Sequence, residues 1–258
     1  MAGSQIERAI HLIELLAQAP RGLALQSLAD EAQVPKSAAH RMLAELSRLG
    51  YVRQNAENAR YLLTTRLVAM GFRHLAGSGV DVVQPILDRL ARDSSELVRL
   101  GVIAQQRLTW IAKAQGAGAG LRYDPDMGRD APLFPTASGH AWLATLSDAQ
   151  ALALVEAQGP LTPDAIGPGA PRHNAELLER LGRARQRGYA QVRDSSAIGT
   201  AAIACAVLHP QHGAAVGVLS IAGPGARLPD EKLTALAPAL LAAAAEISEA
   251  VLVSEWFG

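Results

Sequence analysis

The side chains with the clearest chemistry gather at the start of one predicted helix. Lys36, Ser37, His40 and Arg41 fall on its first two turns, on one broad face. Such groups donate hydrogen bonds to phosphate oxygens and to base edges, and the major groove of DNA accepts a helix of this size. The alternative is a solvated polar face without a partner. Because the surrounding helices complete a DNA-binding pattern, we favour contact with DNA.

Residues outside this helix supply further candidate contacts with DNA. Gln26 and Ser27 begin the preceding helix, where their side chains and the helix N-terminus favour a phosphate group. Arg53, Arg60 and Tyr61 lie on a predicted hairpin, from which they can reach the minor groove or the backbone. An exposed arginine on a hairpin is equally well explained as a solubilising residue, so this second group stays open.

The first element that positions these groups is a helix over residues 4–19. Ser4 is followed by Glu7 at the spacing of a capping box, in which each residue satisfies the other's backbone N–H. The apolar side chains recur at helical spacing and predict one buried stripe: Ile6, Ala9, Ile10, Ile13, Leu16 and Ala17.

Two shorter helices and a hairpin follow. Pro35 suits the first turn of the second of these helices, and Gly50 suits the residue just past its end. The pattern then changes from helical to extended over residues 51–54 and 60–63, which a polar turn separates. Three helices followed by a hairpin predict a winged helix-turn-helix domain over residues 1–64.

Composition limits the class of protein. The 24 basic and 24 acidic residues balance, which argues against nonspecific coating of nucleic acid, although residues 35–66 are locally basic. Cys205 is the only cysteine, so an intrachain disulfide and a cysteine-based zinc site are excluded. The first residues lack the basic start of a signal peptide, and Leu236–Ala245, which contains Pro238, is too short to span a membrane. We expect a soluble, cytoplasmic protein without a membrane partner.

A linker helix and a second domain fill the rest of the chain. The linker covers residues 65–78, and the boundary falls at Gly77-Ser78-Gly79. Residues 79–258 are predicted to be an α+β module, an antiparallel sheet flanked by helices. The predicted helices cover residues 80–92, 136–146, 147–157, 174–187 and 229–253, and the strands cover 96–104, 107–114, 189–193, 200–208 and 214–221.

Four stretches, in this order along the chain, carry a family pattern: VPKSAAHRMLAELSRLGYV, PLFPTASGHAWLATL, GYAQVRDSSAIGTAAIACAVL and VGVLSIAGP. The first resembles the recognition helix of the IclR family of bacterial transcriptional regulators, and the others resemble its C-terminal motifs. The resemblance implies a winged helix-turn-helix, a linker helix and a GAF-like domain that binds a small-molecule effector. It also implies self-association, as a dimer or a dimer of dimers, on roughly palindromic double-stranded operator DNA.

The same resemblance assigns effector-binding positions. Family ligands are often small carboxylates held by an acid, a cysteine and a pair of serines. The matching positions here are Val192 to Asp194, of which Asp194 is the acid, then Ala202, and Ser220 with Ala222. The two alanines make the pocket less polar than one built for a compact acid. His140 also replaces the usual lysine of its motif. We therefore expect an aromatic or other organic acid of a catabolic pathway.

A second group of candidate effector contacts lies near residue 136. Thr136, Ala137 and Ser138 open a predicted helix whose free N–H groups and dipole favour an anion. Ordinary capping by Thr136 is the alternative. Tyr123 lies close to this segment in sequence and is either a pocket aromatic or a core residue.

Other motifs indicate no catalytic, metal or cofactor site. Residues 116–120 are glycine-rich but lack the Lys-Ser/Thr of a phosphate loop, and Ser138 lacks a G-x-S-x-G frame. His209 and His212 have no third metal ligand nearby, and Cys205 is expected to be a buried small hydrophobe. We expect no enzyme. The alternatives are an enzyme acting on a small acid, with a vestigial helix-turn-helix, and a pure interaction module.

Overall fold

Two compact units, Met1–Gly77 and Ser78–Gly258, divide the chain in the computed structural model. Of the predicted boundary Gly77-Ser78-Gly79, only Gly77 is described, as the last residue of a helix; Ser78 and Gly79 lie outside the described residues. The structure describes residues 4–77, 80–118, 121–125, 127–162 and 166–250.

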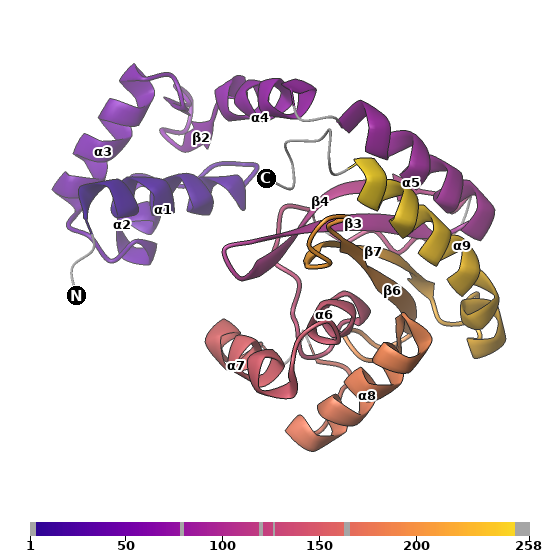
Figure 1. Cartoon of the computed structure of the whole chain (residues 1–258). Coiled ribbons are helices and arrows are strands. Elements are labelled where there is room, and N and C mark those ends of the chain that lie inside the picture. The colour runs from indigo at the N-terminus through magenta and orange to yellow at the C-terminus, as the bar shows by residue number, and fades with distance from the viewer. Residues whose placement is uncertain (1–3, 78–79, 119–120, 126, 163–165, 251–258) are drawn as a thin grey trace. The chain divides into compact units, whose positions relative to one another are not determined.

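The first unit is a winged helix-turn-helix, as predicted (Figure 1). The Ser4 hydroxyl accepts a hydrogen bond from the Glu7 N–H at 3.1 Å, and the Glu7 carboxylate accepts one from the Ser4 N–H at 2.6 Å. These two bonds form the predicted capping box. The elements of the first unit are α1 (Gln5–Ala17), α2 (Leu25–Glu31), α3 (Lys36–Arg48), β1 (Val52–Gln54), β2 (Tyr61–Leu63) and α4 (Thr65–Gly77).

The core of this unit lies where α1, α2, α3 and the hairpin meet. Leu12, Leu28 and Leu43 are fully buried there. The predicted stripe of α1 is wrong at three positions, because Ile6 is 71% exposed, Ile10 is 50% exposed and Ala17 is also exposed. The apolar sector of α1 is wider than the surface that such a small unit can cover, so the Leu12 side is buried and the Ile6 side is left out.

The second unit is a five-stranded antiparallel sheet in the order β4-β3-β7-β6-β5, with helices on both faces. α5 and α9 lie side by side on one face, and α6 and α8 lie on the other (Figure 1). This confirms the predicted α+β class. The elements of the second unit are α5 (Val80–Ser94), β3 (Leu97–Ala104), β4 (Arg107–Gln115), α6 (Ala137–Leu143), α7 (Asp148–Gln158), α8 (Asn174–Arg187), β5 (Ala190–Arg193), β6 (Thr200–Leu208), β7 (Ala215–Pro224) and α9 (Asp230–Ala250).

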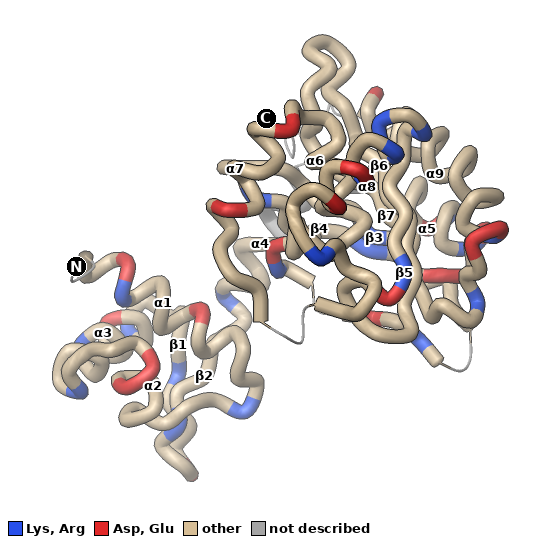
Figure 2. The backbone as a smooth tube through the Cα atoms, turned by 90° about the horizontal axis from the view of Figure 1, so that it is seen from below, with Lys and Arg blue, Asp and Glu red and all other residues tan. Residues whose placement is uncertain are grey.

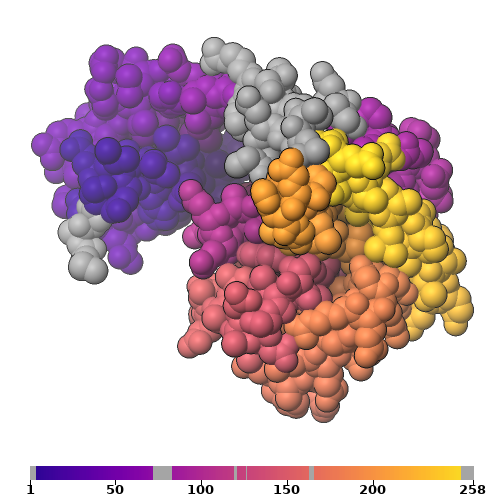
Figure 3. Space-filling view, in the orientation of Figure 1, coloured from indigo at the N-terminus to yellow at the C-terminus, as the bar shows by residue number. Residues whose placement is uncertain are grey.

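The helix α9 is long and apolar enough, by length and composition alone, to cross a membrane. The apolar run Leu236–Ala245 is too short to predict such a segment, but the helix continues on both sides of it and through Pro238. Leu233, Leu240 and Ile247 are fully buried, and α9 packs on β6 and α5. The remaining side of α9 forms an outer surface of the unit (yellow in Figure 3). We therefore assign α9 as a core helix; residues 251–253 lie outside the described residues.

Three helix ends differ from the prediction. Pro35 is the N-cap of α3 rather than a residue of its first turn. Asn174, the first residue of the predicted helix and its expected N-cap, begins α8 but does not cap it. The Nδ1 atom of His173 instead accepts the N–H of Glu176, the third helical residue, at 3.3 Å. α6 ends early, at Leu143, because the chain turns there toward the separately capped α7.

Candidate DNA-recognition surface and effector cavity

The helix α3 has one exposed polar face and one buried apolar face. Lys36, Ser37, His40 and Arg41 are all exposed. The Lys and Arg positions of α3 and of the hairpin are marked in blue in Figure 2. All four side chains predicted from the sequence therefore lie together at the leading end of one helix face. The opposite face is buried and consists of Ala39, Met42, Leu43 and Leu46.

Arg48, at the other end of α3, already has a partner. Its Nε donates to Oε2 of Glu45 at 3.0 Å. This hydrogen bond raises the pKa of Arg48 and lowers the pKa of Glu45. Arg48 is therefore an exposed arginine on the same helix that differs from Arg41 in being ion-paired.

The start of α2 offers less to a phosphate than predicted. Gln26 is exposed, but its Nε2 donates to Oδ1 of Asp30 at 2.8 Å, and Ser27 is half-buried. Ala24 is the N-cap and has no side chain that can accept a hydrogen bond. Gln26 would have to exchange its partner within α2 in order to contact DNA.

Of the three hairpin residues that were predicted to contact DNA, two are exposed at the surface. Arg53 and Arg60 are exposed, and Nη1 of Arg60 also donates to the carbonyl of Gly22 at 3.1 Å. Tyr61 is only 4% exposed and packs in the core of the unit. The prediction that Tyr61 lies on the wing surface is wrong, because an aromatic ring in a short hairpin stabilises the unit by facing inward.

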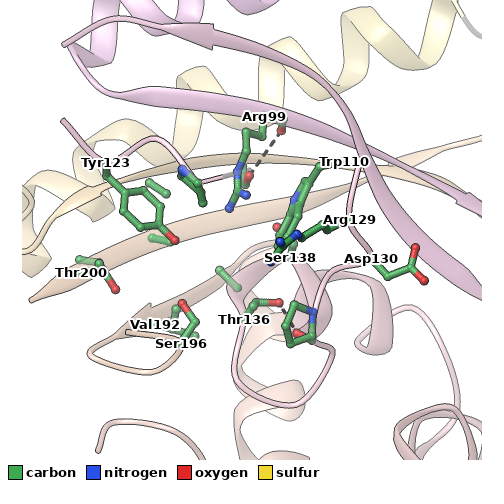
Figure 4. A pocket seen from close by; sticks show the side chains of 17 residues that line it. Arg99, Trp110, Tyr123, Arg129, Asp130, Thr136, Ser138, Val192, Ser196 and Thr200 are labelled. Atoms are coloured by element: carbon green, nitrogen blue, oxygen red, sulfur yellow. Dashed lines mark hydrogen bonds between the residues drawn. The ribbon is translucent and has the colours of Figure 1, made fainter. Parts of the chain in front are cut away.

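A cavity of about 430 Å³ lies in the second unit, on the sheet face that carries α6 (Figure 4). Cavities of this size are typical of small-molecule sites. The predicted effector positions that line it are Tyr123, Thr136, Ala137, Ser138, Ala202, Ser220 and Ala222. Val192, at the start of the matched stretch Val192 to Asp194, also lines it. The other lining residues were not predicted from the sequence and are Arg99, Trp110, Pro125, Arg129, Asp130, Pro132, Ser196, Thr200 and Ala201.

The floor of the cavity is built from directly paired positions of neighbouring strands. Ala202 of β6 pairs with Val192 of β5 and with Ala222 of β7. Ser220 of β7 pairs with Arg99 of β3. Directly paired residues of an antiparallel sheet point to the same face, so these side chains lie side by side. The alanines leave both the space and an apolar surface for a ligand.

Trp110 reaches the same face through an irregularity in the sheet. Leu100 pairs with Ala112, but the next residue, Gly101, pairs with Trp110, so β4 has one extra residue at this point. A β-bulge of this kind shifts the alternation of side chains between the two faces. Trp110 therefore faces the cavity, and the Cζ atom of Arg99 lies 3.8 Å from the centre of its ring.

Thr136 caps α6, as the alternative interpretation proposed. Its Oγ1 accepts the N–H of Gly139 at 2.9 Å and donates to the carbonyl of Pro132 at 2.6 Å. Both hydrogen bonds are local, so the hydroxyl is already engaged. The anion contact that was expected from the start of this helix gains no support from Thr136.

Two family descriptions match the chain. Residues 5–56 match the IclR helix-turn-helix domain, and residues 79–249 match the C-terminal domain of bacterial IclR transcriptional regulators. The chain belongs to the IclR family. It is a DNA-binding transcriptional regulator with an effector-binding C-terminal domain.

Individual IclR relatives agree with this assignment. The chain is 29% identical over 245 residues to the acetate operon repressor of Salmonella typhimurium, covering 94% of this chain and 88% of that protein. Its fold is similar to that of an IclR regulator from Alicyclobacillus acidocaldarius, with a TM-score of 0.84, 23% identity and 100% of both chains covered. An IclR homologue from Microbacterium hydrocarbonoxydans, in complex with 4-hydroxybenzoate, has a TM-score of 0.77 and 20% identity over 97% and 100% of the two chains. The named relatives are regulators, which removes the enzyme alternative.

Asp194, which the IclR resemblance assigned to the effector, does not line the cavity. Its Oδ1 accepts the N–H of Gly199 at 2.6 Å, and its backbone adopts a φ of 50°. Asp and Asn tolerate this left-handed conformation better than most residues. Asp194 therefore shapes the turn that leads into β6, and the expectation of a direct ligand contact is corrected.

Two further predictions concern Cys205 and a histidine pair. Cys205 is buried as predicted, and burial raises the pKa of its thiol to about 12. His209 and His212 stack with ring centres 4.2 Å apart. Among the described residues, no group of three His, Cys, Asp or Glu side chains is placed to hold a metal ion.

His140 occupies the motif position where IclR proteins usually carry lysine, and it is only 1% exposed. Burial lowers its pKa from 6.5 to about 4, although the Phe134 carbonyl, 2.7 Å from Nε2, opposes this shift. The folded protein therefore holds a neutral imidazole that donates from Nε2. Between pH 6.5 and pH 4, the unfolded chain binds a proton that the folded chain does not.

We predict that the second unit loses about 3 kcal/mol of unfolding free energy as the pH falls from 7 to 4, at about 1.4 kcal/mol per pKa unit. His140→Gln should remove most of this loss, because its amide donates to Phe134 but does not titrate. Urea unfolding at several pH values measures the difference. Glu176, whose pKa is lowered to about 2, loses its stabilising contacts at lower pH and equally in both proteins. Parallel pH profiles of the two proteins would contradict the prediction.

Proposed function

We propose that this regulator binds roughly palindromic double-stranded operator DNA as a dimer or a dimer of dimers, and that a small organic acid in the cavity controls this binding. The observation that carries the proposal is the leading face of α3, where Lys36, Ser37, His40 and Arg41 are exposed over a fully apolar underside. The site of action is the bacterial cytoplasm, where the chromosome lies.

Self-association follows from charge and from an uncovered apolar surface. The positive charge of residues 35–66 is modest, so we expect a single DNA-binding unit to release few counterions, to bind weakly and to need a second unit for affinity. Ile6 and Ile10, one turn apart on α1, are exposed. A second copy can cover this pair, and paired helix-turn-helix units read half-sites about 34–36 Å apart.

The chemistry of the cavity favours an organic acid with an aromatic or apolar body. Ala202, Ala222 and Val192 give an apolar floor, while Trp110 and Arg99 supply an aromatic ring and a cation. The homologue that binds 4-hydroxybenzoate has a similar fold. Coupling between ligand and operator needs a difference of only about 1–3 kcal/mol between two states of the protein.

We expect Lys36→Ala and Arg41→Ala each to weaken operator binding about 10-fold, because each removes a direct contact with DNA. The measurement is an electrophoretic mobility shift with DNA from upstream of the gene, at low salt. The double variant should also show a smaller dependence of affinity on salt, because fewer counterions are released.

Arg48→Ala is the matched control, since it removes an exposed arginine from the same helix whose charge is already paired with Glu45. Its affinity should stay close to that of the unchanged protein. If Arg48→Ala weakened binding as much as Arg41→Ala, the assigned face of α3 would be wrong. Failure of the unchanged protein to retard its upstream DNA would contradict the proposed function.

A further inference from the structure

Arg99 is a buried cation in the wall of the cavity. It is 5% exposed, and its Nε and Nη1 atoms have no hydrogen-bond partner among the described residues. An arginine side chain keeps its proton in proteins, so a full positive charge is buried here. Burying a charge without hydrogen bonds destabilises a protein unless an anion or other polar groups compensate for it.

The carboxylates near this end of the cavity are engaged elsewhere. Asp130 accepts from Nη1 of Arg107 at 3.1 Å and from Oγ1 of Thr109 at 2.6 Å. Asp124 pairs with Nζ of Lys113 at 2.5 Å. Burial lowers the pKa of Arg99, and the neighbouring Tyr123 and Asp124 oppose this shift only in part. The positive charge of Arg99 is therefore incompletely compensated by the described residues.

The aromatic ring of Trp110 holds the guanidinium in place. Its centre lies 3.8 Å from Cζ of Arg99, which is a close cation–π contact. Figure 4 shows the guanidinium directed into the cavity between Trp110 and Tyr123. Because the Trp110 ring covers one face of the Arg99 guanidinium, the N–H edge of the guanidinium is the part left for a ligand.

Two hydroxyl groups of the cavity lining are already engaged as donors. Thr136 donates to Pro132, and the Thr200 hydroxyl donates to the carbonyl of Ala197 at 2.6 Å. Each hydroxyl has a single proton to donate, and in these two residues that proton is already used. Arg99, in contrast, has two buried N–H-bearing atoms, Nε and Nη1, without a hydrogen-bond partner among the described residues.

We propose that Arg99 is the residue that recognises the anionic group of the effector, an inference that rests on the proposed function of the cavity. The ligand carries a carboxylate that pairs with the N–H edge of Arg99, and its apolar or aromatic body lies over Ala202 and Ala222. Without this ligand, the protein tolerates a buried charge that its neighbours compensate only in part. Arg99 therefore favours ligand binding at the expense of the stability of the free protein.

The test compares carboxylates with uncharged molecules of the same shape. Benzoate and 4-hydroxybenzoate are the charged probes, and benzamide and 4-hydroxybenzamide are their neutral counterparts. Thermal unfolding of the full chain and titration calorimetry give Tm and Kd. The acids should raise Tm by about 5 °C at roughly 100 times their Kd, whereas the amides should have little effect.

Arg99→Met keeps a long apolar stem against Trp110 but removes the charge. Its free form should unfold at a Tm equal to or above that of the unchanged protein, because an apolar side chain often replaces a buried charge without loss. Its affinity for the acids should fall about 100-fold. Arg99→Lys should bind the acids weakly but still prefer them to the amides, because a charge remains.

Two control variants separate this role from general charge effects. Arg89→Met removes a cation paired with Glu246 on the opposite sheet face, and it should bind the acids normally. Arg129→Met removes the other arginine of the lining and should retain the preference for acids over amides.

Three results would overturn the inference: no rise in Tm with either acid, equal binding of acids and amides, or undiminished binding by Arg99→Met. In the last two cases a ligand still binds, so the effector cavity stands and only the role of Arg99 fails. Retardation of upstream DNA, measured on the same preparation, tests the proposed function separately.

Discussion

Leu43→Ala should abolish operator binding while the effector-binding unit stays folded. Leu43 is fully buried in the core of the first unit, beneath the exposed polar face of α3 that we propose contacts DNA. Replacing a buried leucine by alanine costs about 2–5 kcal/mol. A unit of this size is stabilised by only about 0.05–0.15 kcal/mol per residue, so the loss approaches its whole stability.

Calorimetry of the full chain and a mobility shift measure this result. The unfolding transition of the first unit should move to lower temperature, and that of the second unit should not move. Leu49→Ala is the control, because Leu49 is 40% exposed at the end of the same helix and its truncation leaves no buried cavity. A Leu43→Ala protein with normal operator affinity and normal unfolding would show that this core does not hold α3 in place.

Arg227→Ala should destabilise the second unit by about 3–5 kcal/mol, as is usual when one partner of a buried ion pair is removed. Glu96 is 1% exposed, and both its oxygens accept from Arg227, from Nε and from Nη2, at 2.7 Å each. The hydrogen bond to Glu96 also raises the pKa of Arg227. Because water reaches part of the Arg227 side chain, we expect the lower end of this range.

The same variant should loosen a segment beside the cavity. Nη1 of Arg227 donates to the carbonyl of Leu121 at 2.8 Å, two residues before Tyr123. Urea unfolding measures the stability, and hydrogen exchange of the backbone around Tyr123 measures the local effect. Adding Glu96→Gln to Arg227→Ala should restore part of the stability, because a neutral amide costs less to bury than a carboxylate. If the double variant were no more stable than the single one, an unpaired charge would not be the cause.

Sequence reasoning succeeded best where the determining contacts are local. The capping box of Ser4 and Glu7, the apolar underside of α3 and the hairpin after Gly50 all depend on residues a few positions apart. The sequence did not predict burial correctly where the exposure of a side chain depends on which distant element packs over it. Ile6 and Tyr61 have side chains that suit either a surface or a core, and only the packing of α1 against the hairpin leaves Ile6 exposed and buries Tyr61.

The sequence by itself determined the winged helix-turn-helix, the α+β class of the second unit and most of the small residues that line the cavity. The charge inside the cavity was decided only by tertiary structure. Arg99 and Ser220 are neighbours on the sheet although they lie 121 residues apart in the chain, and such a pairing leaves no local pattern. Opposite the step from Leu100 to Gly101, β4 has one extra residue, and this bulge places Trp110 on the same sheet face as Arg99. Simple alternation along β4 would have placed Trp110 on the other face, so the site depends on a single shift in strand register.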